Sequence, residues 1–384
     1  MKVARIATIP FAIVTQLKSQ LLYLVDSGVH VHIITSDGCE LDRLEWGENL
    51  VLHKLHIARK PSLMADFVSL FRLFILFRRF RFQIVHSTTP KAGLLTSIAG
   101  LFSGVPIRLH TFTGQPWVEM SGVMRLISRS SDKLIGYLNT RCYADSFTQA
   151  KFLVDEGIIK HHKIDVIGSG SLAGVDTNRF SIDRFTNDEK DNFRKQLGIN
   201  SCSFVILFIG RITKDKGIYE LLSAFQKLSN SSVDADLILV GPFDQERGGV
   251  GSISINDISK YNKVHCVGYS EEPEKYLSIS DVLCLPSYRE GFGTVVLEAG
   301  SMGVPTIGSD IYGLRDAVVD GTTGILVPVR DAHRLFEALS LVAKNVDLRV
   351  DMGEAARQRC INKFDSTKVS QCLLDEYNKL LNSL

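Results

Sequence analysis

Two glutamates bracket a pair of glycines in the second half of the chain: Glu290 and Glu298 are separated by seven residues, and Gly291 and Gly293 follow the first glutamate. This segment comes after the apolar run 282–285 and leads into a stretch with helical spacing. Backbone N–H groups at such a helix start favour a phosphate or an anionic leaving group. Glu298, about one turn into the helix, can accept both hydroxyls of a ribose, whereas Glu290 is free to meet a sugar. The combination predicts a site for a sugar nucleotide.

A second loop carries cations. Gly210 follows the apolar run 204–209, and Arg211 and Lys216 come shortly after it. A glycine lets the backbone approach a ligand closely, an arginine binds phosphate through its fork, and a lysine binds it as a point charge. Cations at a solvated helix start are common, so the loop indicates a diphosphate site only together with the glutamates.

One motif has the spacing of a metal site. Asp234 and Asp236 form an Asp-x-Asp pair, but they precede the apolar run 237–240. Ligands of parallel sheets bind beyond the carboxyl ends of the strands, not at the amino edge. We therefore do not expect this pair to bind a metal ion.

The elements that must position these residues alternate between short apolar runs and helical segments, which is typical of parallel sheets covered by helices. A chain of 384 residues is expected to form two domains. We predict an α/β fold with doubly wound domains at 1–175 and 201–365, a linker at 176–200, and a helix at 366–384 that docks across the domains. The expected strands are 3–8, 31–35, 84–86, 107–111, 141–144 and 164–167, then 204–209, 237–240, 264–267, 282–285 and 306–308.

Composition excludes some classes of function. The chain has 44 basic and 42 acidic residues, so it has no bulk field for nucleic acid. Its seven cysteines are odd in number and lack a Cys-x-x-Cys pair, which indicates reduced thiols in the cytosol. Cys266 and Cys284 lie in apolar runs and are expected to be buried. The apolar start breaks at Pro10, so we expect a first strand there, not a signal peptide.

The segment 67–82, FVSLFRLFILFRRFRF, is apolar but rich in arginine. It is too short and too charged to cross a bilayer. Two interpretations stay open: a basic interfacial helix on anionic lipid, and a helix packed on a sheet with its arginines in water.

The glutamates around Gly-Phe-Gly-Thr, with Gly-Arg-x-x-x-x-Lys-Gly upstream, resemble the retaining glycosyltransferases of family four. The likeness covers nearly the whole chain and includes 239–243, 267–269, 303–306 and 316–324. The chain is most similar to the capsule and O-antigen branch, through 89–95 (TPKAGLL), Gly-Val-Asp at 174–176 and Arg-Phe at 179–180.

The resemblance implies a GT-B fold, with an N-terminal acceptor domain and a C-terminal donor domain facing each other across a cleft. It implies that Arg211 and Lys216 neutralise the donor diphosphate and act in catalysis. Glu298 would hold the ribose, and Glu290, also catalytic, would orient the transferred sugar. The other donor-binding residues that it implies are Gly210, Gly241, Gly268 beside the base, Gly291, Phe292, Gly293 and Thr294.

The chain departs from the family in its N-terminal half. Where many relatives have a histidine before a glycine, this chain has Thr113 before Gly114, and both remain expected acceptor contacts. His110 lies earlier, within an expected strand; it is a catalytic candidate, with a core histidine as the alternative. Lys91 stands at an expected helix start, suited to an acceptor phosphate, and an exposed lysine without a role is its alternative.

The expected activity is a metal-independent, cofactor-free hexosyl or N-acetylhexosaminyl transfer with retention. The donor would be a nucleotide sugar, with UDP expected, and the acceptor a polyprenyl-diphosphate-linked saccharide of capsule or O-antigen synthesis. The protein would be cytoplasmic, peripheral on the inner membrane if 67–82 contacts lipid. Two alternatives are a sugar-nucleotide epimerase or hydrolase of the same fold, and a non-catalytic subunit that supports another transferase. UDP release without acceptor would indicate the first, and donor binding without turnover the second.

Overall fold

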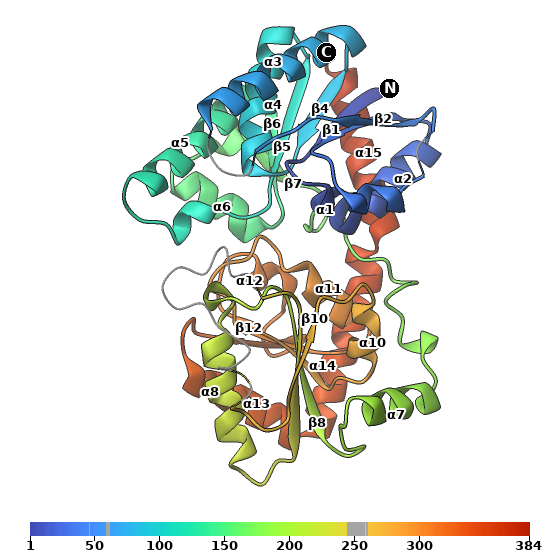
Figure 1. Ribbon diagram of the computed structural model, residues 1–384, viewed down its shortest axis with the longest axis vertical. Coiled ribbons are helices and arrows are strands. Elements are labelled where there is room, and N and C mark those ends of the chain that lie inside the picture. Colours follow the sequence, from blue (N-terminus) through green and yellow to red (C-terminus); the bar gives the residue numbers. More distant parts are fainter. Residues whose placement is uncertain (46, 59–61, 244–257, 259) are drawn as a thin grey trace. The chain divides into compact units, whose positions relative to one another are not determined.

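The computed structural model describes residues 1–45, 47–58, 62–243, 258 and 260–384 (Figure 1). Its contacts divide the chain into two compact units, one made of residues 1–174 and 366–384 and the other of residues 175–365. Each unit holds a parallel sheet with helices packed against it. The predicted α/β class with two Rossmann-like domains is confirmed.

The first unit contains a seven-stranded sheet of order β3-β2-β1-β4-β5-β6-β7, in which every pairing is parallel. The strands are β1 (Lys2–Ile6), β2 (His30–Thr35), β3 (Leu50–Lys54), β4 (Ile84–Ser87), β5 (Ile107–Phe112), β6 (Arg141–Ala144) and β7 (Ile164–Val166). Sequence analysis missed β3, an edge strand whose side chains are mostly half-buried. Its apolar run, 50–52, is short and ends in polar residues, as suits a strand that is covered only in part.

Helices cover both faces of this sheet because consecutive strand residues point to opposite sides. Val3 of β1 belongs to the core formed with α2 (Lys18–Asp26) and α15 (Ser366–Asn382). The next residue, Ala4, belongs to the core formed with α3 (Leu63–Phe80) and α4 (Pro90–Ser103). The remaining helical segments are α1 (Pro10–Ala12), η1 (Ile13–Leu17), η2 (Cys39–Arg43), η3 (Pro116–Val118), α5 (Gly122–Leu138), α6 (Phe147–Asp155) and η4 (His161–Lys163).

The C-terminal helix α15 belongs to the first unit. Its Tyr377 is fully buried, and the hydroxyl accepts a hydrogen bond from Nη1 of Arg5 at 3.0 Å and lies 2.7 Å from Nδ1 of His86. Arg5 and His86 are also buried, so α15 contributes Tyr377 to a buried polar cluster with these two residues. The expected helix is present; its observed contacts place it in one unit, where the sequence suggested docking across both.

The second unit has a six-stranded parallel sheet of order β10-β9-β8-β11-β12-β13. Its strands are β8 (Phe204–Ile209), β9 (Ala235–Val240), β10 (Val264–Gly268), β11 (Val282–Leu285), β12 (Thr306–Ser309) and β13 (Gly324–Val327). Its helical segments are η5 (Ile182–Arg184), α7 (Asn187–Gln196), η6 (Lys214–Lys216), α8 (Ile218–Ser229), α10 (Pro273–Ser278), α11 (Thr294–Ser301), α12 (Leu314–Ala317), α13 (Ala332–Lys344), α14 (Val346–Arg359) and η7 (Cys360–Phe364). The central strands β8 and β11 have the predicted bounds, whereas the edge strand β13 was missed.

The stretch 176–200, interpreted from its polarity as a linker, is part of the second unit. Phe180 and Ile199 lie in the core of that unit. Thr186 starts α7 with a capping box, in which its hydroxyl accepts from Glu189 N–H and the Glu189 carboxylate accepts from Thr186 N–H. The segment is therefore packed structure with a polar surface.

The exposure of Cys266 and Cys284 depends on where their strands lie in the sheet. All seven are free in the described structure. Cys284 of the central strand β11 is buried as predicted, but Cys266 of the edge strand β10 is exposed. The prediction that Cys266 is buried was wrong, because an apolar run on an edge strand need not be covered on both faces.

Candidate active site

Three glycine-containing loops adjoin at the carboxyl edge of β8, β9 and β10. The Gly241 N–H donates to the Gly268 carbonyl at 2.7 Å, and the Gly210 N–H donates to the Val240 carbonyl at 2.9 Å. Gly241 has a φ of 145°, and a Cβ there would lie 1.8 Å from the Gly210 carbonyl oxygen. Only glycine fits this approach. The loops that the sequence proposed for the donor are thus joined through their backbones.

Lys216 closes the single turn η6 in the loop after β8. Its Nζ contacts Oε1 of Glu290, which lies in the loop after β11. The two side chains are only 17% and 15% exposed. The fold therefore brings the predicted phosphate lysine and the predicted sugar-contacting glutamate into one ion pair.

A second carboxylate, that of Asp215, lies close to Arg211 and Arg289. Asp215 Oδ2 lies 3.8 Å from Arg211 Nη2 and 3.5 Å from Arg289 Nη2. Burial raises the pKa of Asp215, but the Thr213 hydroxyl, which donates to it at 2.5 Å, and the two arginines outweigh burial and hold the pKa below its usual value. Arg289 Nε is buried without a hydrogen-bond partner in the described structure. Arg289 is a third cation that sequence analysis did not select.

Helix α11 begins at Thr294, where the sequence predicted it. Its N-cap is Gly293 with a φ of 79°, and a Cβ there would come within 2.8 Å of the Leu314 side chain. Phe292 is 2% exposed and packs against Phe364, with ring centroids 5.3 Å apart. The first-turn N–H groups of a helix have no partner within it. The loop that carries Arg289 and Glu290 leads into this N-terminus, so the positive end of the helix dipole directly follows these side chains in the chain.

Glu298 lies inside α11 and is half-buried. Burial raises its pKa to about 7; the nearby Arg179 charge opposes this rise, and the Glu274 charge adds to it. Near neutral pH this carboxyl group is poised between its two states. The ionised form accepts hydrogen bonds through both oxygens, which is the form that the predicted ribose contact needs.

The Asp-x-Asp pair has protein partners. Asp236 accepts from the Ser203 hydroxyl at 2.5 Å and lies 2.7 Å from His265 Nε2. Asp234 pairs with Lys263. Across the described ranges, no group of three potential metal ligands was found. The pair sits at the amino edge of β9, as expected from its place in the sequence.

In the first unit, His110 is a buried residue of β5. It is 1% exposed, its Nδ1 lies 2.9 Å from the Ser87 hydroxyl, and burial lowers its pKa to about 3. A Cβ at Gly93 of α4 would lie 2.5 Å from its ring. The geometry fits a packed core histidine and gives no support to the catalytic role considered for His110.

The expected acceptor residues lie after neighbouring strands β4 and β5. Lys91 is in the first turn of α4, as predicted, and its Nζ pairs with Asp66 of α3 at 2.6 Å. Thr113 donates its hydroxyl to the Thr88 carbonyl at 3.2 Å, and Gly114 has a φ of 130°. An acceptor phosphate would have to compete with Asp66 for Lys91.

Comparisons with known proteins agree with this geometry. Residues 189–359 match the family model "Glycosyl transferases group 1", and residues 12–169 match "Glycosyl transferase 4-like domain". The capsular polysaccharide biosynthesis glycosyltransferase CapM of Staphylococcus aureus is 31% identical over 95% of this chain and 94% of its own. The chain belongs to glycosyltransferase family four.

Three further comparisons extend this assignment. An Escherichia coli UDP-Gal:alpha-D-GlcNAc-diphosphoundecaprenol alpha-1,3-galactosyltransferase is 27% identical over 84% of this glycosyltransferase and 81% of its own chain. The solved sucrose-phosphate synthase of Thermosynechococcus elongatus has a TM-score of 0.83 at 20% identity, covering all of both chains. HepE of Anabaena with UDP has a TM-score of 0.78 at 17% identity, also with full coverage. The GT-B fold that the resemblance implied is confirmed.

Asp145 is a buried carboxyl group that sequence analysis overlooked. Asp145 directly follows β6, is 5% exposed, and its Oδ1 has no hydrogen-bond partner in the described structure. Burial raises its pKa to about 8. Its only sequence signal was its place at the carboxyl end of a strand.

Asp145 should make the stability of the protein depend on pH. Between the unfolded aspartate pKa of about 3.9 and the folded value of about 8, the folded state binds the extra proton. The free energy of unfolding contributed by this group therefore falls as pH rises through that window and is level above it. We expect D145N to remove this component, so that its melting temperature falls less than that of the wild type between pH 5 and 8.

The exposed Asp155 of α6 provides the matched control. D155N should keep the wild-type pH profile in the same thermal unfolding series. Parallel profiles for D145N and the wild type would show that Asp145 does not titrate as described.

Proposed function

We propose that this glycosyltransferase moves a hexosyl or N-acetylhexosaminyl group from a UDP-sugar to a polyprenyl-diphosphate-linked saccharide in capsule or O-antigen synthesis. The observation that carries the proposal is the Lys216–Glu290 ion pair, beside Arg211 and Arg289 and next to the start of α11. These groups stabilise charge that develops on a departing diphosphate. A metal ion is not required for that task, and we propose that none takes part.

The proposed reaction retains the anomeric configuration. The acceptor hydroxyl attacks the anomeric carbon from the leaving-group side, the bond from that carbon to the diphosphate oxygen breaks, and the acceptor proton passes to the departing phosphate. UDP leaves with that proton. Lys216 and Arg211 balance the new phosphate charge, and Glu290 orients the sugar, so no protein nucleophile is needed.

Three comparisons support the substrate classes. The E. coli relative is named for a UDP-Gal donor and a diphosphoundecaprenol acceptor. A Campylobacter jejuni relative, 24% identical over 79% of this chain, is named for an undecaprenol-linked acceptor and N-acetylgalactosaminyl transfer. The Anabaena structure is described in complex with UDP.

A thermal-shift series without metal would test donor binding directly. At about 100 times its dissociation constant, a ligand stabilises the folded state by roughly 2.7 kcal/mol. We expect UDP and UDP-sugars to raise the melting temperature, GDP and ADP to have little effect, and R211A or E298A to abolish the response. A response to GDP or ADP in place of UDP would overturn the nucleotide assignment. Turnover assays with lipid-linked saccharides then separate transfer from hydrolysis, which releases UDP without acceptor.

We also propose that the enzyme contacts the cytosolic face of the inner membrane through α3. No helix in the described ranges is both long and apolar enough to cross a membrane. One face of α3 packs into the core through Leu73 and Phe77. Its other side chains include Leu63, Phe67 and Phe71, which are 92%, 68% and 57% exposed.

The exposed face of α3 is suited to lipid because of its arginines and because the neighbouring helices also expose apolar side chains. The exposed arginines on and just after α3 are Arg72, Arg78, Arg79 and Arg81. Helix α4 packs against α3 and exposes Phe102, and α5 packs against α4 and exposes Val123 and Leu126. Apolar side chains interspersed with arginines suit the headgroup region of an anionic bilayer. Both sequence interpretations of 67–82 are combined here, because one face packs on the sheet while the other is available to lipid.

A further inference from the structure

The loops after β8 and β11 are joined around Asp215. The Tyr288 N–H donates to the Asp215 carbonyl at 2.9 Å. Gly217, with a φ of 71°, lies so close to the second loop that a Cβ on it would come within 2.1 Å of the Pro286 carbonyl oxygen. Strands β8 and β11 pair directly in the sheet, so the two loops start side by side. The backbone of Asp215 is therefore held by both loops.

The carboxylate of Asp215 is held as well. Its Oδ1 accepts from the Thr213 hydroxyl at 2.5 Å. Its Oδ2 lies 3.5 Å from Arg289 Nη2 and 3.8 Å from Arg211 Nη2, so one oxygen is within ion-pair distance of two guanidinium groups from different loops. The three charged side chains are between 24% and 30% exposed, so water screens them only in part. Without this carboxylate the two guanidinium charges would repel each other and move apart.

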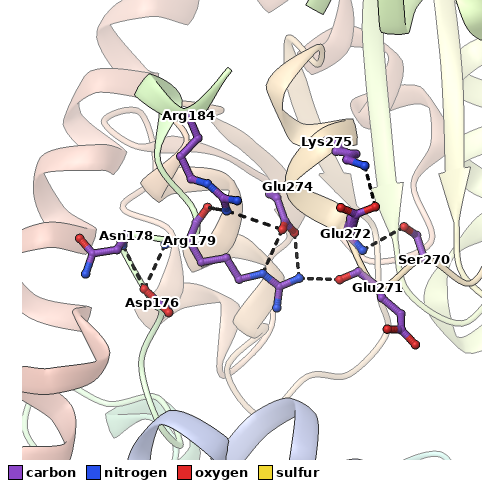
Figure 2. A network of polar contacts seen from close by, with 9 residues as sticks. All are labelled: Asp176, Asn178, Arg179, Arg184, Ser270, Glu271, Glu272, Glu274 and Lys275. Atoms are coloured by element: carbon purple, nitrogen blue, oxygen red, sulfur yellow. Dashed lines mark hydrogen bonds and ion pairs between the residues drawn. The ribbon is translucent and has the colours of Figure 1, made fainter. Parts of the chain in front are cut away.

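Another pair in the same unit shows how a fully engaged arginine is bound (Figure 2). Arg179 Nε and Nη2 donate to the two Glu274 carboxylate oxygens at 3.1 and 2.8 Å, and Nη2 also donates to the Glu271 carbonyl at 2.5 Å. Such a bidentate pair occupies the fork of the guanidinium. The Asp215 contact to Arg289 is longer and lies at Nη2, and among the described residues the buried Nε of Arg289 has no hydrogen-bond partner. Arg289 is thus oriented at one corner and keeps a donor for another acceptor.

The acceptor that suits these donors is a phosphate group. A buried N–H without a partner costs free energy, and a phosphate supplies both the oxygen and the negative charge that two neighbouring guanidinium groups attract. A neutral hydroxyl would leave the second positive charge uncompensated. Arg289 also directly precedes Glu290, whose carboxylate pairs with Lys216, so it adjoins the groups that are expected to meet the donor.

We propose that Asp215 is a positioning residue, which holds Arg289 and Arg211 so that both bind one phosphate group of the donor. The inference rests on the proposed function, in which cations of these loops balance the diphosphate, and it adds a role for Asp215, which does not itself touch the substrate. As a negative charge, Asp215 also weakens the attraction for phosphate. Positioning is the larger effect, because hydrogen bonds depend steeply on donor placement, whereas a partly solvated charge contributes little.

The test compares the affinities of UDP and uridine for the full-length protein by calorimetry, with uridine titrated in competition with UDP. Base and ribose are common to both ligands, so the ratio of the two dissociation constants isolates the contribution of the diphosphate. The wild type should strongly prefer UDP. R289M and D215N should each lower this preference about ten-fold, the size expected for one lost charge-assisted hydrogen bond, and leave uridine binding unchanged.

Three further variants separate position from charge. T213V removes the hydroxyl that orients Asp215 but keeps the carboxylate, so a reduced UDP preference in this variant shows that placement matters. D215N/R289M should lose less than the product of the two single losses, because Asp215 acts through Arg289. R184M is the matched control: Arg184 lies 3.7 Å from Glu274 in the network of Figure 2, so the variant removes an arginine charge from the same unit and should keep the wild-type preference.

The outcomes separate two failures. A raised UDP preference in D215N would show that Asp215 only competes with phosphate, and an unchanged preference would show that it does not position the arginines; either result overturns the inference and leaves the donor proposal intact. If D215N does not fold, an unchanged preference in T213V overturns the inference in its place. A wild type that binds UDP no more tightly than uridine, or binds no UDP, would overturn the proposed donor and the inference with it.

Discussion

Replacing Lys216 with alanine is expected to lower turnover by at least about a hundred-fold, the usual cost of removing one preorganised group that stabilises leaving-group charge. The effect should be large because Lys216 is mostly buried against Glu290, where its charge is poorly screened. It should appear in kcat, because the diphosphate charge grows as the bond to the sugar breaks. Initial rates of UDP release with a lipid-linked acceptor would measure it.

Lys214 is the matched control for this change. It lies on the same turn, η6, two residues before Lys216, and it is exposed. K214A should keep turnover within about two-fold of the wild type, as expected of an exposed side chain with no part in the site. E290Q should lower turnover as K216A does, since the two residues act together. Equal rates for K216A and K214A would contradict the assigned role of Lys216.

Placing two glutamates on the outer face of α3, in the double variant F67E/F71E, should reduce binding to vesicles of anionic phosphatidylglycerol by more than ten-fold. The change removes two exposed aromatic side chains and adds negative charge beside exposed arginines. Both the apolar and the electrostatic contribution to interfacial binding are lost. Vesicle flotation at low salt would measure the bound fraction.

A matched control lies in the other unit. Val350 of α14 is 60% exposed, so V350E makes the same type of change on a helix that we do not assign to lipid. It should bind vesicles as the wild type does. R78E/R79E should weaken binding chiefly at low salt, because screening already reduces attraction at high salt. Unaltered flotation of F67E/F71E and R78E/R79E would rule out α3 as the contact.

Sequence periodicity predicted the central strands better than the edges. β8 and β11 are buried on both sides by helices, so each reads as a continuous apolar run with sharp ends. The edge strands β3 and β13 are only partly buried, and the apolar run in each is short, 50–52 in β3 and 325–327 in β13. The exposure of Cys266 has the same origin, because residue type alone does not say which strand of a sheet lies at its edge.

The candidate donor site was predictable to the extent that it follows the ends of strands. Gly210, Lys216 and Glu290 could be selected because each lies in a loop after an apolar run. Arg289 and Asp215 sit in the same loops, but their importance comes from pairing across loops, which no local pattern encodes. Arg179 was part of the resemblance without a role, since its partner Glu274 is 95 residues away in the sequence.

The packing of α15 into the first unit has a consequence for the order of folding during synthesis. The core around β1 includes Leu373 and Tyr377, so it stays incomplete until the last helix has left the ribosome. Residues 175–365 form their own core and have all their parts earlier. Domains of a growing chain generally fold from the N-terminus onward. Here we expect residues 175–365 to reach their native state first. Residues 1–174 cannot complete their core before α15 has been synthesised, so they are the part that depends on protection from aggregation.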